Sequence, residues 1–235
     1  MGKGIGRIFK TILKTAFYLA VIYFAITFLS VILYRFINPP FTPIMIIRAA
    51  GQIAAGEPVR LRKHWVPLDE IAPSLQLAVV SSEDNRFLEH HGFDIDAIEK
   101  ARDYNQRHKG KKVMGASTIS QQTAKNVFLW PQRSWLRKGL EAYFTFLIEL
   151  VWNKKRIMEV YLNVIELGKG IYGAEEASEL YYGKTAAALG RSESAMLAAI
   201  IPDPLRWDPR FPTSYMNSRQ QWILWNMENI GKLEY

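Results

Sequence analysis

Residues 73–94 read PSLQLAVVSSEDNRFLEHHGFD, and they join an apolar helical segment to a cluster of ionisable side chains. Pro73 suits the first turn of a helix, and the apolar residues that follow it predict that this helix is buried. Glu83 and Asp84 come directly after the apolar run. The segment is therefore either a polar loop that follows a core helix or the position of an active-site carboxylate.

The chain after residue 94 continues in helical patterns, with Asn153 placed to cap one of them. No alternation typical of strands extends beyond a few residues. The fold class predicted is mostly α, with one compact domain. The further helices are expected at residues 94–106, 117–129, 134–152, 154–167, 174–183, 192–202 and 217–233, separated by a basic loop at 107–117 and a glycine-rich break at 168–173.

The N-terminal region contains an uncharged run, TAFYLAVIYFAITFLSVILY, between Lys14 and Arg35. A helix of this length spans about 30 Å, which is the thickness of a bilayer core. A cleaved signal peptide is the alternative, but its apolar region is shorter, about 7–15 residues, and ends in small residues. The run passes instead into RFINPPFTP, so we predict a single uncleaved transmembrane helix at residues 15–34.

Positive charge precedes this helix, because residues 1–14 contain lysines and an arginine and no acid. The positive-inside rule places the N-terminus in the cytoplasm and residues 38–235 on the other side of the cytoplasmic (inner) membrane, in a periplasmic or extracellular location. The predicted organisation is a basic cytoplasmic tail (1–14), the transmembrane helix (15–34), a linker and membrane-proximal segment (35–59) and the main domain (60–235).

The composition excludes several kinds of chemistry. The 235 residues include no cysteine, which rules out disulfides, thiolate metal sites and cysteine nucleophiles. The net charge is +8. Nucleic acid is the usual partner of basic stretches, but a domain outside the cytoplasm would not meet it, so a lipid phosphate or diphosphate fits better. The basic residues concerned are Lys100, Arg102, Arg107, Lys109, Lys111, Lys112, Lys125, Arg133, Arg137 and Lys138.

A second candidate acid, Glu141, lies four residues after Arg137 and three after Lys138. On a helix this spacing places the three side chains on one face. An ordinary surface ion pair has the same spacing, so this pattern alone does not separate a structural role from a functional one.

The stretch GASTISQQTAKN, residues 115–126, would form a helix with two polar strips. Gln121 and Lys125 make one strip, and Gln122 and Asn126 make the other. These strips suit a sugar ligand or a solvated face equally well. In the preceding stretch, His90 and His91 lack the three or four ligands that a metal cage needs. We expect His90 to form a hydrogen bond and His91 to be exposed.

Five stretches now occur together in a characteristic order: EDNRFLEHHGFD, GASTISQQTAKN, RKGLE, KRIMEVYLNVIELGKGIYG and LAAIIPDPLRWDP. In order and spacing they resemble the signature motifs of the peptidoglycan glycosyltransferases, family 51 of the glycosyltransferases. The resemblance covers about residues 60–211. The chain contains no S-x-x-K or K-T-G segment, so it resembles the monofunctional branch rather than the penicillin-binding bifunctional one.

This resemblance implies a fold and a reaction. The fold would be a lysozyme-like helical glycosyltransferase domain with a membrane-embedded lobe. The substrate would be lipid II, a disaccharide-pentapeptide on undecaprenyl diphosphate, and the product the β-1,4-linked glycan strand. Glu83 matches the catalytic base, which would deprotonate the 4-hydroxyl of the acceptor sugar in an inverting displacement. An apolar lead-in such as LAVV would help to raise the pKa of this carboxyl.

The resemblance also implies roles for other residues. Asp84 and His90 would orient the site, with Phe87 among the substrate-binding residues. Glu141 matches the second essential glutamate, which would hold the cationic side chains in place or help to bind a divalent cation (Mg²⁺ or Mn²⁺) at the diphosphate. The resemblance implies no organic cofactor. The residues that would line the glycan cleft are Thr118, Gln121, Gln122 and Asn126. Those on the diphosphate side would be Lys125, Arg133, Arg137 and Lys138. The residues of the fourth motif that would shape the fold are Tyr161, Asn163, Gly168, Gly170 and Gly173.

One departure from the pattern is small: Ala116 stands where relatives often have a second glycine. The partners implied are lipid II, the growing glycan strand, the membrane, and proteins of cell-wall synthesis or division. Two other functions remain open. A lysozyme-like glycan-cleaving enzyme could use a glutamate acid on the same fold, and a non-catalytic membrane scaffold of a cell-wall complex would need the anchor but neither glutamate.

Overall fold

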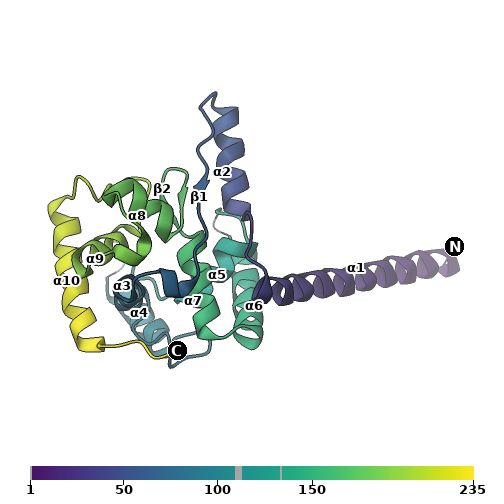
Figure 1. Ribbon diagram of the computed structural model, residues 1–235. Coiled ribbons are helices and arrows are strands. Elements are labelled where there is room, and N and C mark those ends of the chain that lie inside the picture. The colour runs from purple at the N-terminus through teal and green to yellow at the C-terminus, as the bar shows by residue number, and fades with distance from the viewer. Residues whose placement is uncertain (1, 109–112, 133) are drawn as a thin grey trace. The chain divides into compact units, whose positions relative to one another are not determined.

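The computed structural model describes residues 2–108, 113–132 and 134–235 of the chain. The chain divides at Asn38 and Pro39 into two compact units. The N-terminal unit contains helix α1 (Gly2–Phe36), and the second unit, Pro39–Tyr235, contains every other helix and strand that the structure describes. Figure 1 traces this order along the chain.

Helix α1 has the length and composition of a membrane span. Its segment Lys10–Phe36 has a mean hydropathy of 2.4 over its most apolar window. The hydroxyl groups of Thr27 and Ser30 donate hydrogen bonds to carbonyl oxygens about one turn earlier in the helix. Polar groups that are satisfied within one helix are what a bilayer core requires. The predicted span at residues 15–34 lies inside this segment.

The second unit begins with α2 (Pro43–Ala54), which has a proline in its first turn, as helix starts often do. Met45 and Gln52 are buried on α2, while Ile46 and Ile53 are exposed. An extended segment follows and contains strand β1 (Arg62–Lys63) and the short 3₁₀ helix η1 (Leu68–Glu70). Helix α2 contacts α5, so it belongs to the compact unit although it lies in the predicted linker.

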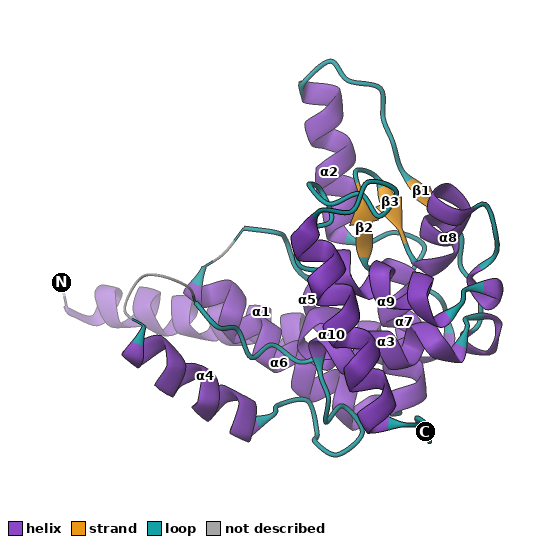
Figure 2. Cartoon of the chain, turned by 90° about the vertical axis from the view of Figure 1, so that its left-hand side faces the viewer, coloured by secondary structure: helices purple, strands orange, loops and turns teal. Residues whose placement is uncertain are grey.

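Two groups of helices form the core. The first group is α3 (Pro73–Glu83), α9 (Arg191–Ile200) and α10 (Ser214–Ile230), which pack on one another (Figure 1). The second is α5 (Ile119–Phe128), which packs on both α6 (Trp135–Val151) and α7 (Lys154–Val164). The rings of Phe128 and Phe144 stack at 4.5 Å in the second group. Helix α4 (Ile95–Arg107) buries only Ala101 and lies at the edge of the unit, away from the sheet (Figure 2).

A small sheet completes the unit. It has the order β1-β3-β2, with β1 parallel and β2 (Glu166–Gly168) antiparallel to β3 (Ile171–Tyr172). Helix α8 (Ala174–Tyr182) and the 3₁₀ helix η2 (Ala186–Ala188) follow it. Strands of two or three residues are too short to show an alternating pattern, which is why the sequence gives no sign of them. The mostly α prediction is confirmed.

The fourth motif builds the connection between the sheet and α7. Asn163 is fully buried, and its side chain accepts a hydrogen bond from Val66 N at 2.9 Å and donates one to Val66 O at 2.9 Å. Gly170 has a φ of +75°, and a Cβ atom there would lie 2.2 Å from the carbonyl oxygen of Arg60. These contacts agree with the expectation that this motif shapes the fold.

The close approach at Gly170 predicts an effect on stability. Gly183 also has a positive φ, +67°, but a Cβ atom there would meet nothing within 4 Å. We expect Gly183→Ala to cost about 1–2 kcal/mol from backbone strain alone. Gly170→Ala should cost about 1–3 kcal/mol more, because β1 must move away. Urea unfolding of the detergent-solubilised chain measures the difference, and equal losses in the two variants would contradict this account of Gly170.

Candidate functional site

A cavity of about 830 Å³ lies beside the C-terminal end of α3. Its walls come from segments that are far apart in the sequence: the end of α3 and the following turn, the first turns of α4, residues 113–118, α5 and α10. The side chains that line it include Glu83, Asp84, Thr118, Gln122, Tyr215, Arg219 and Trp222.

Glu83 is the last residue of α3, and its side chain is only 13% exposed. One carboxylate oxygen accepts a hydrogen bond from Gln122 Nε2 at 2.9 Å, and the other accepts one from Arg219 Nη2 at 3.1 Å. Burial raises the pKa of this carboxyl above its ordinary value, although Gln122, Arg219 and Lys125 act in the opposite direction. A carboxylate in such an environment is a stronger base than a solvated one.

Asp84 ties the turn after α3 to the start of α5. One oxygen accepts a hydrogen bond from Ile119 N at 3.0 Å, and the other lies 2.8 Å from His90 Nε2. His90 Nδ1 accepts a hydrogen bond from Gly92 N, so the ring proton is on Nε2 and points to Asp84. His91 is exposed. The hydrogen-bonding role expected for His90 and the exposure expected for His91 are both confirmed.

Helix α5 starts with a capping box. The Thr118 hydroxyl accepts a hydrogen bond from Gln121 N, and the Gln121 side chain accepts one from Thr118 N at 3.0 Å. Thr118 and Gln122 line the cavity, whereas the buried Gln121 and Asn126 do not. The T-x-x-Q pattern is a recognisable sign of such a cap, and it would have separated Gln121 from the residues that face the cavity.

Gln122 connects the two core groups at the site. Its Nε2 donates to Glu83 of α3, and its Oε1 accepts a hydrogen bond from the Tyr161 hydroxyl of α7 at 3.1 Å. Since Tyr161 fixes which end of the amide points to Glu83, the hydrogen bond to the carboxylate has a defined direction.

The position of Phe87 differs from the expectation that it is among the substrate-binding residues. Its side chain is completely buried and does not line the cavity. The turn after α3 folds back, with Phe87 N donating to Asp84 O, and directs the ring into the protein, where Lys154 Nζ lies 4.7 Å from the ring centroid. In this structure Phe87 supports the turn that carries Asp84 and does not face a substrate.

Glu141 lies in a separate cluster on α6. Its buried carboxylate is 3.4 Å from Arg137 Nη1 and 2.5 Å from Lys138 Nζ, the two partners that the spacing predicts. None of these three residues lines the cavity beside Glu83. Lys125, on α5, is close enough to Glu83 to lower its pKa. Arg133, expected on the diphosphate side, lies outside the described residues.

Helix α10 provides site residues that the sequence analysis missed. Tyr215, Arg219 and Trp222 line the cavity, and they follow one another at helical spacing. Arg219 also lies three residues after Met216 and four before Ile223, both fully buried. A single arginine among the buried positions of a helix was the available signal, since a charge there requires a partner.

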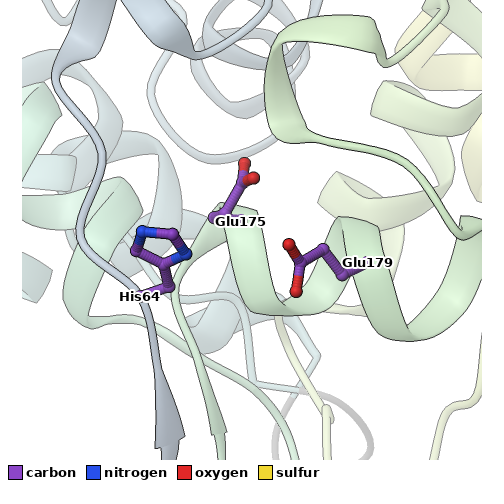
Figure 3. A group of neighbouring side chains, drawn as sticks. All are labelled: His64, Glu175 and Glu179. Atoms are coloured by element: carbon purple, nitrogen blue, oxygen red, sulfur yellow. The ribbon is translucent and has the colours of Figure 1, made fainter.

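A group of possible metal ligands lies outside this cavity. His64, Glu175 and Glu179 have potential ligand atoms within 4.8 Å of one another. Glu175 accepts a hydrogen bond from Ala186 N, and in the view of Figure 3 its carboxylate turns away from Glu179 and His64. His64 and Glu179 are exposed. The Glu175 carboxylate is therefore already used in a contact between α8 and η2.

Comparisons with known proteins show the family to which the chain belongs. The sequence model of the transglycosylase family matches residues 51–228. A protein of Bdellovibrio bacteriovorus is 57% identical over 206 residues, 87% of this chain and 82% of the relative. One of Bacteroides thetaiotaomicron is 52% identical, covering 95% of this chain and 89% of the relative. A protein of Shewanella oneidensis is 49% identical, and the match covers 98% of this chain and 96% of the relative.

All three relatives are named biosynthetic peptidoglycan transglycosylase. Their similarity extends over most of the chain. The resemblance that the five motifs carry is thereby confirmed, and the chain belongs to the transglycosylase family.

Proposed function

We propose that this protein polymerises lipid II into the β-1,4-linked glycan strands of peptidoglycan, with Glu83 as the general base. The observation that carries the proposal is a buried carboxylate on the wall of a large cavity, held by a neutral donor and a cation. Family membership and the names of the relatives support the reaction, and the geometry around Glu83 supports its role.

The chemistry is an inverting displacement. Glu83 takes the proton of the 4-hydroxyl group of the acceptor sugar, and that oxygen forms a bond to the anomeric carbon of the donor chain. The bond from this carbon to the diphosphate oxygen breaks, and undecaprenyl diphosphate leaves with the electron pair. A raised pKa suits this step, since the carboxylate must be ionised before the reaction and protonated after it.

The leaving diphosphate needs positive charge near it. Lys125, Arg137 and Lys138 are the described cations that we assign to this task. Lys138 is 46% exposed, so its ammonium group can exchange contact with Glu141 for contact with a phosphate. Both oxygens of Glu141 face cations, so we assign it to positioning Arg137 and Lys138. A divalent cation at the diphosphate remains an expectation.

The membrane helix suits a lipid-linked substrate. Helix α1 is long and apolar enough to cross a bilayer, and the basic residues of the first fourteen positions favour a cytoplasmic N-terminus. This topology in the cytoplasmic membrane would place residues 39–235 outside the cytoplasm, where the undecaprenyl chain and the diphosphate of lipid II meet the aqueous phase. Proteins of cell-wall synthesis or division are expected partners on the same side.

The base assignment predicts the behaviour of Glu83→Gln. Polymerisation of labelled lipid II by the purified detergent-solubilised chain should fall by at least about 10²-fold, the size of a general-base effect. Binding of lipid II should stay close to that of the wild type, because the amide has nearly the same shape. Gel analysis of the product and a binding titration measure the two quantities.

Three outcomes of that experiment are informative. Full activity of Glu83→Gln would refute the base assignment. Shorter fragments from finished peptidoglycan, in place of longer chains from lipid II, would indicate a glycan-cleaving enzyme. Bound lipid II with no product from the wild-type chain would indicate a scaffold.

The charge assignment predicts a different defect in Lys138→Ala. Loss of one charge-assisted contact to the diphosphate should reduce kcat/KM for lipid II about 10- to 100-fold. Lys184→Ala is a matched control, because Lys184 also pairs with a glutamate, Glu193, at 2.7 Å and is not assigned to the diphosphate. Equal rates of Lys138→Ala and the wild type across lipid II concentrations would exclude this role.

A further inference from the structure

Helix α10 is fixed to the protein independently of its arginine. Met216, Ile223 and Met227 are fully buried on it, and the helix packs against α9 and α3. Asn226 Nδ2 also donates a hydrogen bond to Ser81 O of α3 at 3.3 Å. These contacts hold α10 beside the helix that carries Glu83, so Arg219 is not needed to dock it.

The guanidinium of Arg219 is directed at one acceptor. Nη2 lies 3.1 Å from Glu83 Oε1, and the two side chains are 19% and 13% exposed. Arg219 Nε is buried and has no hydrogen-bond partner among the residues that the structure describes. An arginine that served only to tie two helices together would be expected to use this donor on a backbone carbonyl. The guanidinium thus contacts the Glu83 carboxylate although its Nε donor is left without a hydrogen bond to a described residue.

We propose that Arg219 is a positioning residue for the general base, which holds the Glu83 carboxylate ionised and in one orientation toward the cavity. The inference rests on the proposed function, because it concerns the same carboxylate. It adds a residue from α10, which lies beyond the five motifs, to the machinery of the reaction.

Two contacts define the orientation of the base. Gln122 Nε2 and Arg219 Nη2 bind different oxygens of Glu83 from opposite core groups, since α5 belongs to one group and α10 to the other. With both oxygens held, the carboxylate has one preferred rotamer. The lone pair that takes the proton then has a fixed direction, which a freely rotating carboxylate would lack.

The ionisation of Glu83 depends on the charges around it. Burial favours the protonated form, and the neighbouring Asp84 adds to this effect, whereas Lys125 of α5 and Arg219 of α10 favour the ionised form. Tyr161 of α7 is buried beside the pair of acids and stays neutral, because burial and the two carboxylates raise its pKa. Removing Arg219 takes away one of two cations, and the balance shifts toward protonation.

The test is the pH dependence of polymerisation for the full-length protein in detergent, with labelled lipid II between pH 5 and 9. In Arg219→Gln the acidic limb of the rate profile should move upward by about one pH unit or more, the usual effect of one nearby charge. The rate at pH 5–6 should fall about tenfold or more, whereas on the alkaline plateau, where Glu83 is ionised in both proteins, only the lost orientation acts and the rate should fall by no more than about threefold. In Arg219→Lys, which keeps the positive charge, the acidic limb of the rate profile should return most of the way to its wild-type position.

Two controls separate this role from a structural one. Arg191→Gln removes a cation from α9 that lines a different cavity, and it should leave the profile unchanged. Thermal unfolding of each variant at pH 8 reports on folding. A structural defect would lower the rate at every pH and would not be corrected at the alkaline end.

The outcomes that overturn the inference are distinct. Coincident profiles of Arg219→Gln and the wild type would show that the cation does not act on the base. A raised KM for lipid II at all pH values, without a moved limb, would make Arg219 a substrate-binding residue instead. If the wild type makes polymer and Glu83→Gln does too, the base assignment fails and this inference fails with it; if Glu83→Gln is inactive and the profiles coincide, only this inference fails.

Discussion

The burial of one carboxylate governs the arrangement of the candidate site. Glu83 ends a helix whose residues from Leu75 to Ser81 are all buried, and its own side chain is also largely shielded from solvent. An ionised carboxylate in such a place is unstable without donors and opposite charge. The protein supplies these from elements distant in the sequence: Gln122 of α5 and Arg219 of α10.

Helix α5 is the element that serves both core groups. Its capping box fixes its first turn, its first backbone amide binds Asp84, and Gln122 reaches Glu83 one turn later. Helices α6 and α7 pack on its other side, and Tyr161 of α7 sets the direction of the Gln122 amide. The polar start of α5 thus has two tasks, since it caps the helix and places Gln122 to hold the Glu83 carboxylate.

Sequence reasoning was sufficient where local chemistry decides the structure. Pro73 marked the start of α3, the uncharged run marked α1, and the spacing of Arg137, Lys138 and Glu141 gave their contacts. It was insufficient where tertiary packing decides. The identity of an aromatic residue in a motif, such as Phe87, does not tell whether its side chain faces the core or a ligand. Strands of two residues carry no period, and a partner such as Arg219 is 136 positions away from Glu83 in the chain.

The two glutamates differ in a way that accounts for their different assignments. Glu141 is buried and has a cation on each oxygen, so its charge is neutralised within its own helix, and it does not line the cavity beside Glu83. Glu83 has one cation and one amide, and it lines a cavity large enough for sugar rings. A proton acceptor needs incomplete neutralisation and access to the reacting hydroxyl. Of these two buried carboxylates, only Glu83 combines both, whereas Glu141 is suited to keeping its cations in place.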